Sequence, residues 1–302
     1  MLLLCLLTAI ASSSTAFAAE ARDVYYQGDL APLNIVPTFD KGHLVVYDRD
    51  HKINVYAPDG SPLYSAAAQV PNTDWADIQN AAVDTDGTLV GAIRYSRAKR
   101  TSGGGIVLFD RTGAQIRFVD TGLYLPTQVC FAPDHSIWTV GWQGPEAIGK
   151  NEDYFILQNY SQDGQQLGAF LPRSSFDAEP DPVGPMTGAW QLRTSNGRVG
   201  AIFYASSILR TWQKPRSAEQ WVETDLKGKE TGRWDFASRS LLAFTQSGAI
   251  YGQEHDVAVF DRATTNWRPV AGMPDGHLLG ADGESLVFSL RGQSVLRWVP
   301  AR

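Results

Sequence analysis

Two kinds of tight turn recur at regular places along the 302-residue chain. The first kind separates two short runs of β-branched, aliphatic and aromatic residues, and stands at Lys41-Gly42, Asp86-Gly87, Asp134-His135, Asn196-Gly197, Ser247-Gly248 and Asp282-Gly283. The second kind closes a hairpin further along a repeat, at Asp59-Gly60, Thr112-Gly113, Asp163-Gly164 and Lys227-Gly228. Because a recurrence of about 20–50 residues indicates a repeat architecture, these turns predict a fold built from repeated units.

Each repeat has room for four short strands. Gly and Asn suit the positive φ of tight hairpin turns, and the flanking Val, Ile, Phe, Tyr and Trp suit strands. Runs such as "GIVLF" (105–109) are apolar on both faces, as expected of sheets packed between two neighbours. Four antiparallel strands repeated radially describe a blade of a β-propeller. We therefore predict an all-β fold, a six-bladed β-propeller of four-stranded antiparallel blades. Two stacked β-sandwiches are the alternative, but they do not require six equivalent turns.

The last repeat ends one strand short. Residues 277–300 supply three strands, and the segment "RDVYYQGDL" (22–30) predicts a strand that has no other partner. Pairing it with the segment around 294–300 would close the ring and remove an exposed edge. The expected blades are 34–69, 78–122, 126–172, 188–236, 240–272, and 277–300 together with 22–30.

These turns resemble those of the six-bladed propellers of the NHL and TolB-like type. The resemblance is carried by "VYAPDG" (55–60), an aromatic residue four positions before a hairpin Gly, and by "VDTDGTLV" (83–90), an Asp-Gly turn between strands. It covers nearly all of the chain after residue 18. It implies the fold, which binding proteins and enzymes share.

The first eighteen residues predict a signal peptide. "LLLCLLTAIA" (2–11) is apolar, and Ala16-Phe17-Ala18 has the small-x-small form of a cleavage site. The alternatives are a buried N-terminal strand or an uncleaved anchor. We expect residues 19–302 to form a single propeller domain that is exported, to the periplasm or beyond the cell, with no membrane insertion after cleavage. We also expect a monomer.

Charge and cysteine content exclude some functions. The formal net charge is −6, which gives no general attraction for nucleic acid. Loss of Cys5 would leave Cys130 alone, in "QVCFAP" (128–133), where a buried and inert thiol is expected. "VDTDG" (83–87) lacks the later ligands of a calcium loop, and the five histidines show no metal-site spacing. We therefore expect no metal site, no cofactor and no catalytic residue.

The ligand-binding face should lie at the mouth of the central channel. In a propeller the first strand of each blade lines the channel, and long loops over blades two to four favour function there. Amide, aromatic and charged side chains near these strand ends suit a small polar ligand, a peptide or a protein partner. The candidate ligand-binding residues are Trp75, Asp77, Gln79, Asn80, Arg94, Gln128, Trp142, Trp190, Gln191, Tyr204 and Glu254. An alternative is that such polar residues only fill a hydrated channel.

Two other functions stay open. A metal-dependent propeller enzyme, lactonase-like or quinoprotein dehydrogenase-like, would need several convergent carboxylates, for which the chain offers Asp77, Asn80, Gln128 and Glu254. An envelope assembly scaffold would carry an exposed aromatic patch, for which Trp142, Trp212 and Trp221 are candidates. We expect a non-catalytic binding protein.

Overall fold

The computed structural model describes residues 21–25, 37–47, 52–97, 101–143, 153–176, 192–205, 218–235, 239, 241–290 and 294–301. These residues form strands β1 to β24 and one 3-10 turn at Arg173–Ser175. The predicted all-β fold is confirmed.

The strands follow one another in groups of four. The first group is β2 (Thr38–Asp40), β3 (His43–Tyr47), β4 (Ile53–Tyr56) and β5 (Pro62–Ala66). The second is β6 (Trp75–Val83), β7 (Leu89–Arg97), β8 (Thr101–Phe109) and β9 (Gln115–Gly122). The third is β10 (Tyr124–Phe131), β11 (Ile137–Gln143), β12 (Phe155–Tyr160) and β13 (Gln166–Pro172). The fourth is β14 (Leu192–Ser195), β15 (Arg198–Ala205), β16 (Ala218–Asp225) and β17 (Glu230–Asp235). The fifth is β18 (Leu241–Phe244), β19 (Ile250–Gln253), β20 (Val257–Asp261) and β21 (Asn266–Pro269). The last strands are β22 (Gly276–Asp282), β23 (Ser285–Leu290) and β24 (Val295–Pro300), which β1 (Arg22–Tyr25) completes.

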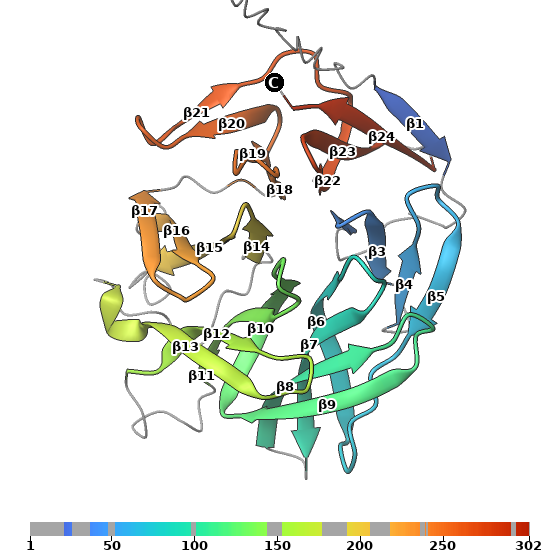
Figure 1. Ribbon diagram of the computed structural model, residues 1–302, viewed down its shortest axis with the longest axis vertical. Coiled ribbons are helices and arrows are strands. Elements are labelled where there is room, and N and C mark those ends of the chain that lie inside the picture. Colours follow the sequence, from blue (N-terminus) through green and yellow to red (C-terminus); the bar gives the residue numbers. More distant parts are fainter. Residues whose placement is uncertain are drawn as a thin grey trace, which may run out of the picture.

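Hydrogen bonding arranges these strands into four sheets of four strands and one sheet of eight. Within each group, sequential strands pair antiparallel. Figure 1 shows the sheets placed around a common centre, with the first strand of each group innermost. This radial arrangement of four-stranded antiparallel sheets is that of a β-propeller, so the predicted propeller fold is confirmed.

The eight-stranded sheet has the order β1-β24-β23-β22-β2-β3-β4-β5. Its two halves meet at one parallel pair, Phe39 with Gly280. A side chain at position 280 would collide with the carbonyl oxygen of Phe39, so glycine is what lets β2 and β22 approach closely enough to pair. The structure therefore has five hydrogen-bonded sheets, whereas six separate blades were predicted.

The N-terminal strand closes the ring at this sheet. β1 pairs antiparallel with β24, from Arg22 opposite Trp298 to Tyr25 opposite Val295. Two 2.6 Å hydrogen bonds join the guanidinium of Arg297 to the carboxylate of Asp23. The guanidinium of Arg22 lies 4.3 Å from the centre of a Trp298 ring. The predicted closure is confirmed for residues 22–25, and the remainder of the predicted strand, 26–30, lies outside the described residues.

The predicted turns take the expected backbone conformation. Left-handed φ is found at Gly42, Gly60, Gly87, Gly113, Gly164, Gly197, Gly228, Gly248 and Gly283. At the one turn without glycine, His135 takes this conformation, with φ of 63°. There the amide N–H of His135 donates to the carbonyl of Ala132, as that of Gly87 does to Asp84. Position 135 is thus equivalent to the glycine positions of the other repeats.

The apolar core lies between neighbouring sheets. The largest cluster joins Val90 and Leu108 of the second group to Trp138 of the third and Val222 of the fourth. Trp138 is fully buried and stacks on Phe170, with ring centres 5.4 Å apart. The strands are apolar on both sides because each sheet is covered on two faces.

We expect Gly280→Ala to destabilise the fold. The new methyl group must push β2 away from β22, and such overpacking costs about 1–3 kcal/mol. For a chain of this size that corresponds to about 2–4 °C in Tm per kcal/mol, which thermal unfolding followed by circular dichroism would measure. Lys227→Ala, in an exposed hairpin, is the control. An unchanged Tm in Gly280→Ala would contradict the proposed role of this close approach.

Candidate functional site

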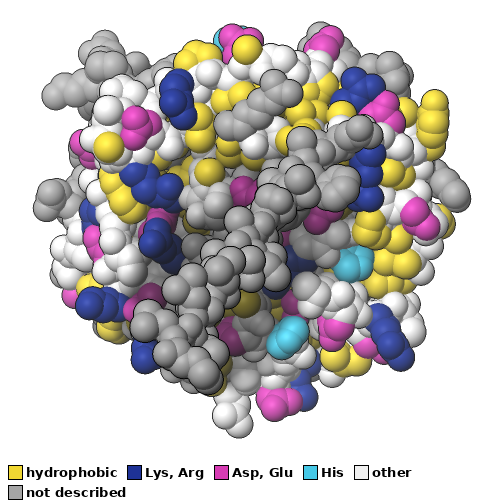
Figure 2. Space-filling model, turned by 45° about the horizontal axis from the view of Figure 1, so that its top comes forward, with side chains coloured by type: hydrophobic (Ala, Val, Ile, Leu, Met, Phe, Trp, Pro, Cys, Tyr) yellow, Lys and Arg dark blue, Asp and Glu magenta, His cyan; other side chains and the backbone are white. Residues whose placement is uncertain are grey.

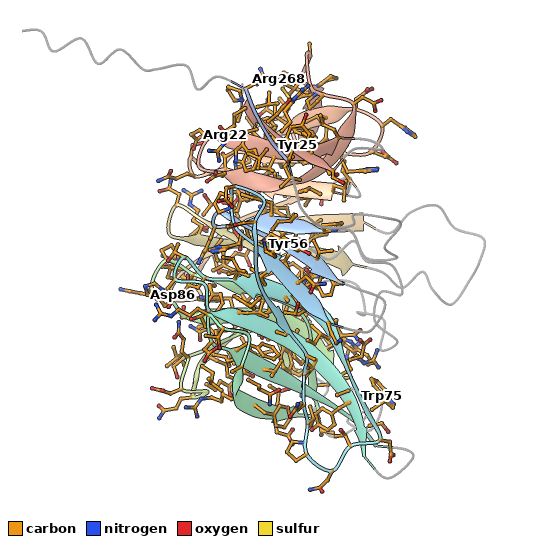
Figure 3. The ribbon with its side chains drawn as sticks, turned by 90° about the vertical axis from the view of Figure 1, so that its right-hand side faces the viewer. Arg22, Tyr25, Tyr56, Trp75, Asp86 and Arg268 are labelled. Atoms are coloured by element: carbon orange, nitrogen blue, oxygen red, sulfur yellow. The ribbon has the colours of Figure 1, made fainter. Side chains whose placement is uncertain are left out.

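The two faces of the ring differ in their connections. Figure 3 shows the molecule from the side, with Trp75 at one face and Asp86 at the opposite face. We call the face with Trp75 the loop face, because first strands begin and second strands end there. We call the face with Asp86 the turn face, because the tight turns between first and second strands lie there.

Several predicted residues lie together at the loop-face end of β6 and β7. Asp77 pairs with Arg94, and Trp75 with Ser96. The indole of Trp75 is 47% exposed, although most large aromatic side chains of the described chain are buried. The amide Nε2 of Gln79 donates to Oδ2 of Asp77 over 3.0 Å. This end of the sheet thus presents an exposed ring beside a hydrogen-bonded carboxylate.

Asn80 has a structural contact. Its Oδ1 accepts a 3.0 Å hydrogen bond from the amide of Val129, in the first strand of the neighbouring sheet. The register shifts by one residue between Ile78 and Asn80, which leaves Gln79 out of the ladder. Gln128 is half-buried and follows a similar shift in β10. The two irregular strands meet where the predicted site lies.

Arg94 connects these two sheets. Its guanidinium lies 5.8 Å from the centre of a Trp142 ring, and Trp142 is only 7% exposed. The Nε atom of Arg94 is buried, and it has no hydrogen-bond partner among the residues that the structure describes. A buried donor without an acceptor costs free energy, and such a group in a native protein calls for an explanation such as a bound molecule.

A run of glycines allows the close approach of these sheets. Gly103, Gly104 and Gly105 lie within β8, and a side chain at Gly104 would collide with the carbonyl oxygen of Tyr124 in β10. Gly105 is similarly close to Phe118, and Gly103 to Tyr95. The run "SGGGI" is thus explained by packing of a strand against its neighbours.

The remaining predicted residues are not brought into this group. Trp190 and Gln191 lie outside the described residues, and so does the side chain of Tyr204 in β15. Glu254 is exposed in the short turn between β19 and β20, in another sheet. Glu254 and His255 both follow the end of β19 at Gln253, so neither lies on a strand. Of the three candidates for an exposed aromatic patch, Trp142 and Trp221 are buried, and Trp212 lies outside the described residues.

Sequence reasoning missed a charged cluster on the turn face. The Nζ atom of Lys41 lies 3.1 Å from Oδ1 of Asp84, and Nδ1 of His135 lies 2.6 Å from Oδ2. The three residues come from the turns of three successive strand groups, and the Asp84 side chain is 1% exposed. The sequence signal was that all three residues lie in the turns between first and second strands of consecutive repeats.

The cluster shifts two pKa values in opposite directions. Burial opposes ionisation of Asp84, but the hydrogen bond from His135 and the charge of Lys41 outweigh it, so the pKa of Asp84 is lowered. The hydrogen bond to Asp84, with its negative charge, raises the pKa of His135. An ionised Asp84 between two cations is the state that the fold favours.

Two other ionisable groups of the inner strands are affected by burial. Burial raises the pKa of Asp40, with the charges of Arg193 and Lys41 acting against it. Burial also raises the pKa of the Cys130 thiol, which is 2% exposed. This environment disfavours a nucleophilic thiolate. Among the described residues, no group of three or more His, Cys, Asp and Glu side chains has the arrangement of a metal site.

The surface in Figure 2 carries mixed charge: Lys and Arg side chains are interspersed with Asp and Glu. Within the described part of the chain, no helix has both the length and the apolar character needed to cross a membrane.

We expect stability to decrease as the pH rises above neutrality, through His135. Because the folded-state pKa of His135 is raised, its stabilising contribution is complete below the unfolded-state value of about 6.5 and is lost as the pH rises through the higher folded-state value. In His135→Asn the decrease in Tm from about pH 6.5 upward should be smaller than in the wild type. His255→Asn, which changes an exposed histidine of another sheet, is the control. Equal pH profiles for His135→Asn and the wild type would exclude this linkage.

The comparisons find propellers with low identity. No protein-family model matches the sequence, and no curated protein matches it. The chain is similar to a gluconolactonase from Xanthomonas campestris, with 16% identity, 86% of this chain and 82% of that chain covered, and a TM-score of 0.44. It is similar to BamB from Moraxella catarrhalis, with 14% identity over 87% and 71% of the two chains and a TM-score of 0.41. It is also similar to the Dos1 propeller, with 11% identity over 88% and 78% and a TM-score of 0.46.

Proposed function

We propose that this protein is an exported, non-catalytic propeller that binds a small polar ligand, a peptide or a protein segment at the loop face. In this proposal the eight-stranded sheet comprises two blades, so the ring has six, and the last is closed by the N-terminal strand. Binding takes place over blades two to four and centres on the junction of β6 and β7 with β10 and β11.

The observation that carries the proposal is the buried Nε of Arg94, which finds no acceptor in the described part of the chain. A carbonyl or carboxylate oxygen of a ligand would supply the missing acceptor. Hydrogen bonds that involve a charged group contribute about 1.5–3 kcal/mol, so this one donor would favour a ligand with an oxygen acceptor. Contact with Trp142 limits where the guanidinium can lie, which reduces the entropy lost on binding.

The neighbouring groups suggest the rest of the ligand. Trp75 offers an exposed ring for stacking, and the Asp77 carboxylate accepts hydrogen bonds. A peptide group carries both an acceptor oxygen and a donor N–H, and a sugar hydroxyl can serve as either. Of these, the peptide backbone matches the combination of a cationic donor, an anionic acceptor and an aromatic surface.

The test uses the tripeptide Ala-Ala-Ala as probe and Trp fluorescence as readout, because Trp75 is exposed at the site. We expect Arg94→Ala to weaken binding by about 10- to 150-fold, which corresponds to the loss of one charged hydrogen bond. Arg111→Ala, which removes the same charge from an exposed hairpin on the turn face, should leave affinity unchanged. Trp75→Ala should remove most of the fluorescence response.

Two outcomes would contradict the proposal. Equal affinity of the wild type and Arg94→Ala would remove Arg94 from the site. Tightly held calcium at one ion per chain, measured by plasma mass spectrometry before and after chelator dialysis, would favour the metal-dependent enzyme. Export is tested separately, by N-terminal sequencing of the mature protein, which should begin at Ala19.

A further inference from the structure

A cavity of about 520 Å³ opens on the loop face at a different place, between the fifth strand group and β22. Its walls come from the turn between β19 and β20 and from the connection of β21 to β22. Pockets of about 300–1,000 Å³ are typical of small-molecule sites. The volume therefore suits a small ligand.

Three apolar side chains, those of Val257, Val270 and Met273, contribute to the lining and are held in place. Val257 is 3% exposed, and Val270 and Met273 pack partly against the core cluster that includes Val257 and Leu278. Gln253 connects the two sides, because its Nε2 donates to the carbonyl of Gly276 and its Oε1 accepts from the amide of Leu278, both over 2.7 Å. The polar atoms of Gln253 are thus satisfied within the protein, and the wall is preformed.

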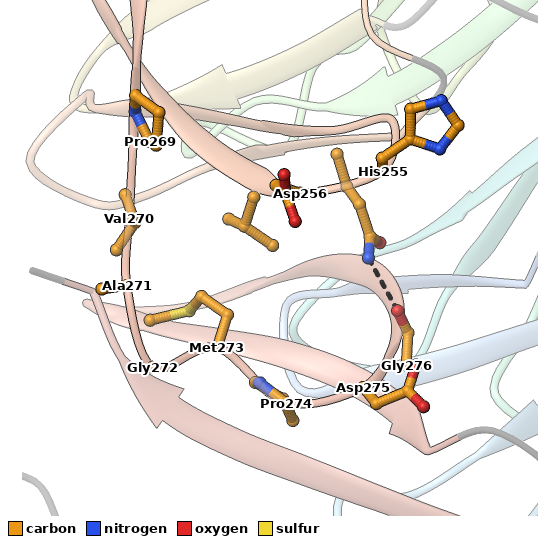
Figure 4. Close-up of a pocket in the computed structure, with 12 residues that line it drawn as sticks. His255, Asp256, Pro269, Val270, Ala271, Gly272, Met273, Pro274, Asp275 and Gly276 are labelled. Atoms are coloured by element: carbon orange, nitrogen blue, oxygen red, sulfur yellow. Dashed lines mark hydrogen bonds between the residues drawn. The ribbon is translucent and has the colours of Figure 1, made fainter.

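The opening carries negative charge. Asp256 and Asp275 line the cavity, and both are exposed. In Figure 4 the Met273 side chain extends towards Val270 and Ala271, while the imidazole of His255 is turned away from Met273. Arg239 also lies nearby and is engaged within the protein: its Nη1 donates to the backbone carbonyl of Asp256 over 2.7 Å, and its guanidinium lies 4.9 Å from the centre of a Trp267 ring.

We propose that this cavity binds a small alkylammonium ligand, with the alkyl chain against Val257, Val270 and Met273 and the ammonium group beside Asp256 and Asp275. The apolar wall selects a hydrocarbon body, and the thioether of Met273 adapts to methylene groups of differing position. The carboxylates select a positive head group over a neutral or negative one. This site is separate from the Arg94 site, so either proposal can fail without the other.

The first test is a titration of the mature protein with hexylamine at pH 7, followed by calorimetry. We expect hexylamine to bind at least 10-fold more tightly than 1-hexanol and hexanoate to show no binding, because only the amine carries the matching charge. Affinity should rise along the series from methylamine to hexylamine as more methylene groups are buried. The absence of any heat of binding at about 10 mM hexylamine, a concentration above the Kd of ligands that bind in the millimolar range, would overturn the proposal. Equal affinities for hexylamine and hexanol would also overturn it.

The second test locates the ligand. The sequence holds three methionines, Met1, Met186 and Met273, and cleavage of the signal peptide would leave two. With 13C-methyl methionine labelling, we expect hexylamine to shift the resonance of Met273 and not that of Met186; Met273→Leu assigns the signal. A shift confined to Met186 would overturn the proposal.

The third test removes the charge and keeps the shape. Asp256→Asn and Asp275→Asn should each weaken hexylamine binding at least 3-fold and together at least 10-fold, with unchanged binding of hexanol. Both residues are exposed, so the variants should fold, which the methyl spectrum reports. Asp163→Asn removes an exposed carboxylate from a distant hairpin and should have no effect. Unchanged affinity in the double variant would overturn the proposal.

Discussion

Face-to-face packing between neighbouring sheets holds this protein together. Each strand group buries apolar side chains on two sides, and clusters such as that of Val90, Trp138 and Val222 extend across several groups. A sheet in such a ring cannot shift without disturbing the packing of both neighbours. Side chains at the loop-face ends of the strands, such as Arg94 and Asp77, are therefore supported by a rigid framework, which favours their precise placement.

The repeated turns allowed most of the fold to be predicted. Positive φ is a local property, and Gly or Asn next to it can be recognised in a single sequence. The turn at Asp134-His135 was predicted from the same pattern, although His135 stands where the other repeats have a glycine. The merging of two strand groups at Phe39 and Gly280 was not predictable, because it depends on the approach of two strands about 240 residues apart in the sequence.

The site was predicted less completely, for a related reason. The repeat pattern predicts which strand ends carry Trp75, Asp77 and Arg94. That Arg94 lies over Trp142, or that Asn80 bonds the amide of Val129, depends on how two twisted sheets meet. The cluster of Lys41, Asp84 and His135 likewise requires three turns to converge, and no single turn reveals it. One wall of the cavity beside Asp256 is the connection between β21 and β22. The sequence pattern does not indicate the path that this connection takes.

The pairing of β1 with β24 has a consequence for how the protein comes to be made. The strand at residues 22–25 finds its partner only in residues 295–298, so the ring stays open until nearly the whole chain has been synthesised. Until β24 has been synthesised, residues 22–25 have no strand to pair with. The step that completes the last strand group therefore comes late in synthesis, after the other strand groups have been made. The same pairing covers the outer edge of β24, which would otherwise be open to pairing with a strand of another chain.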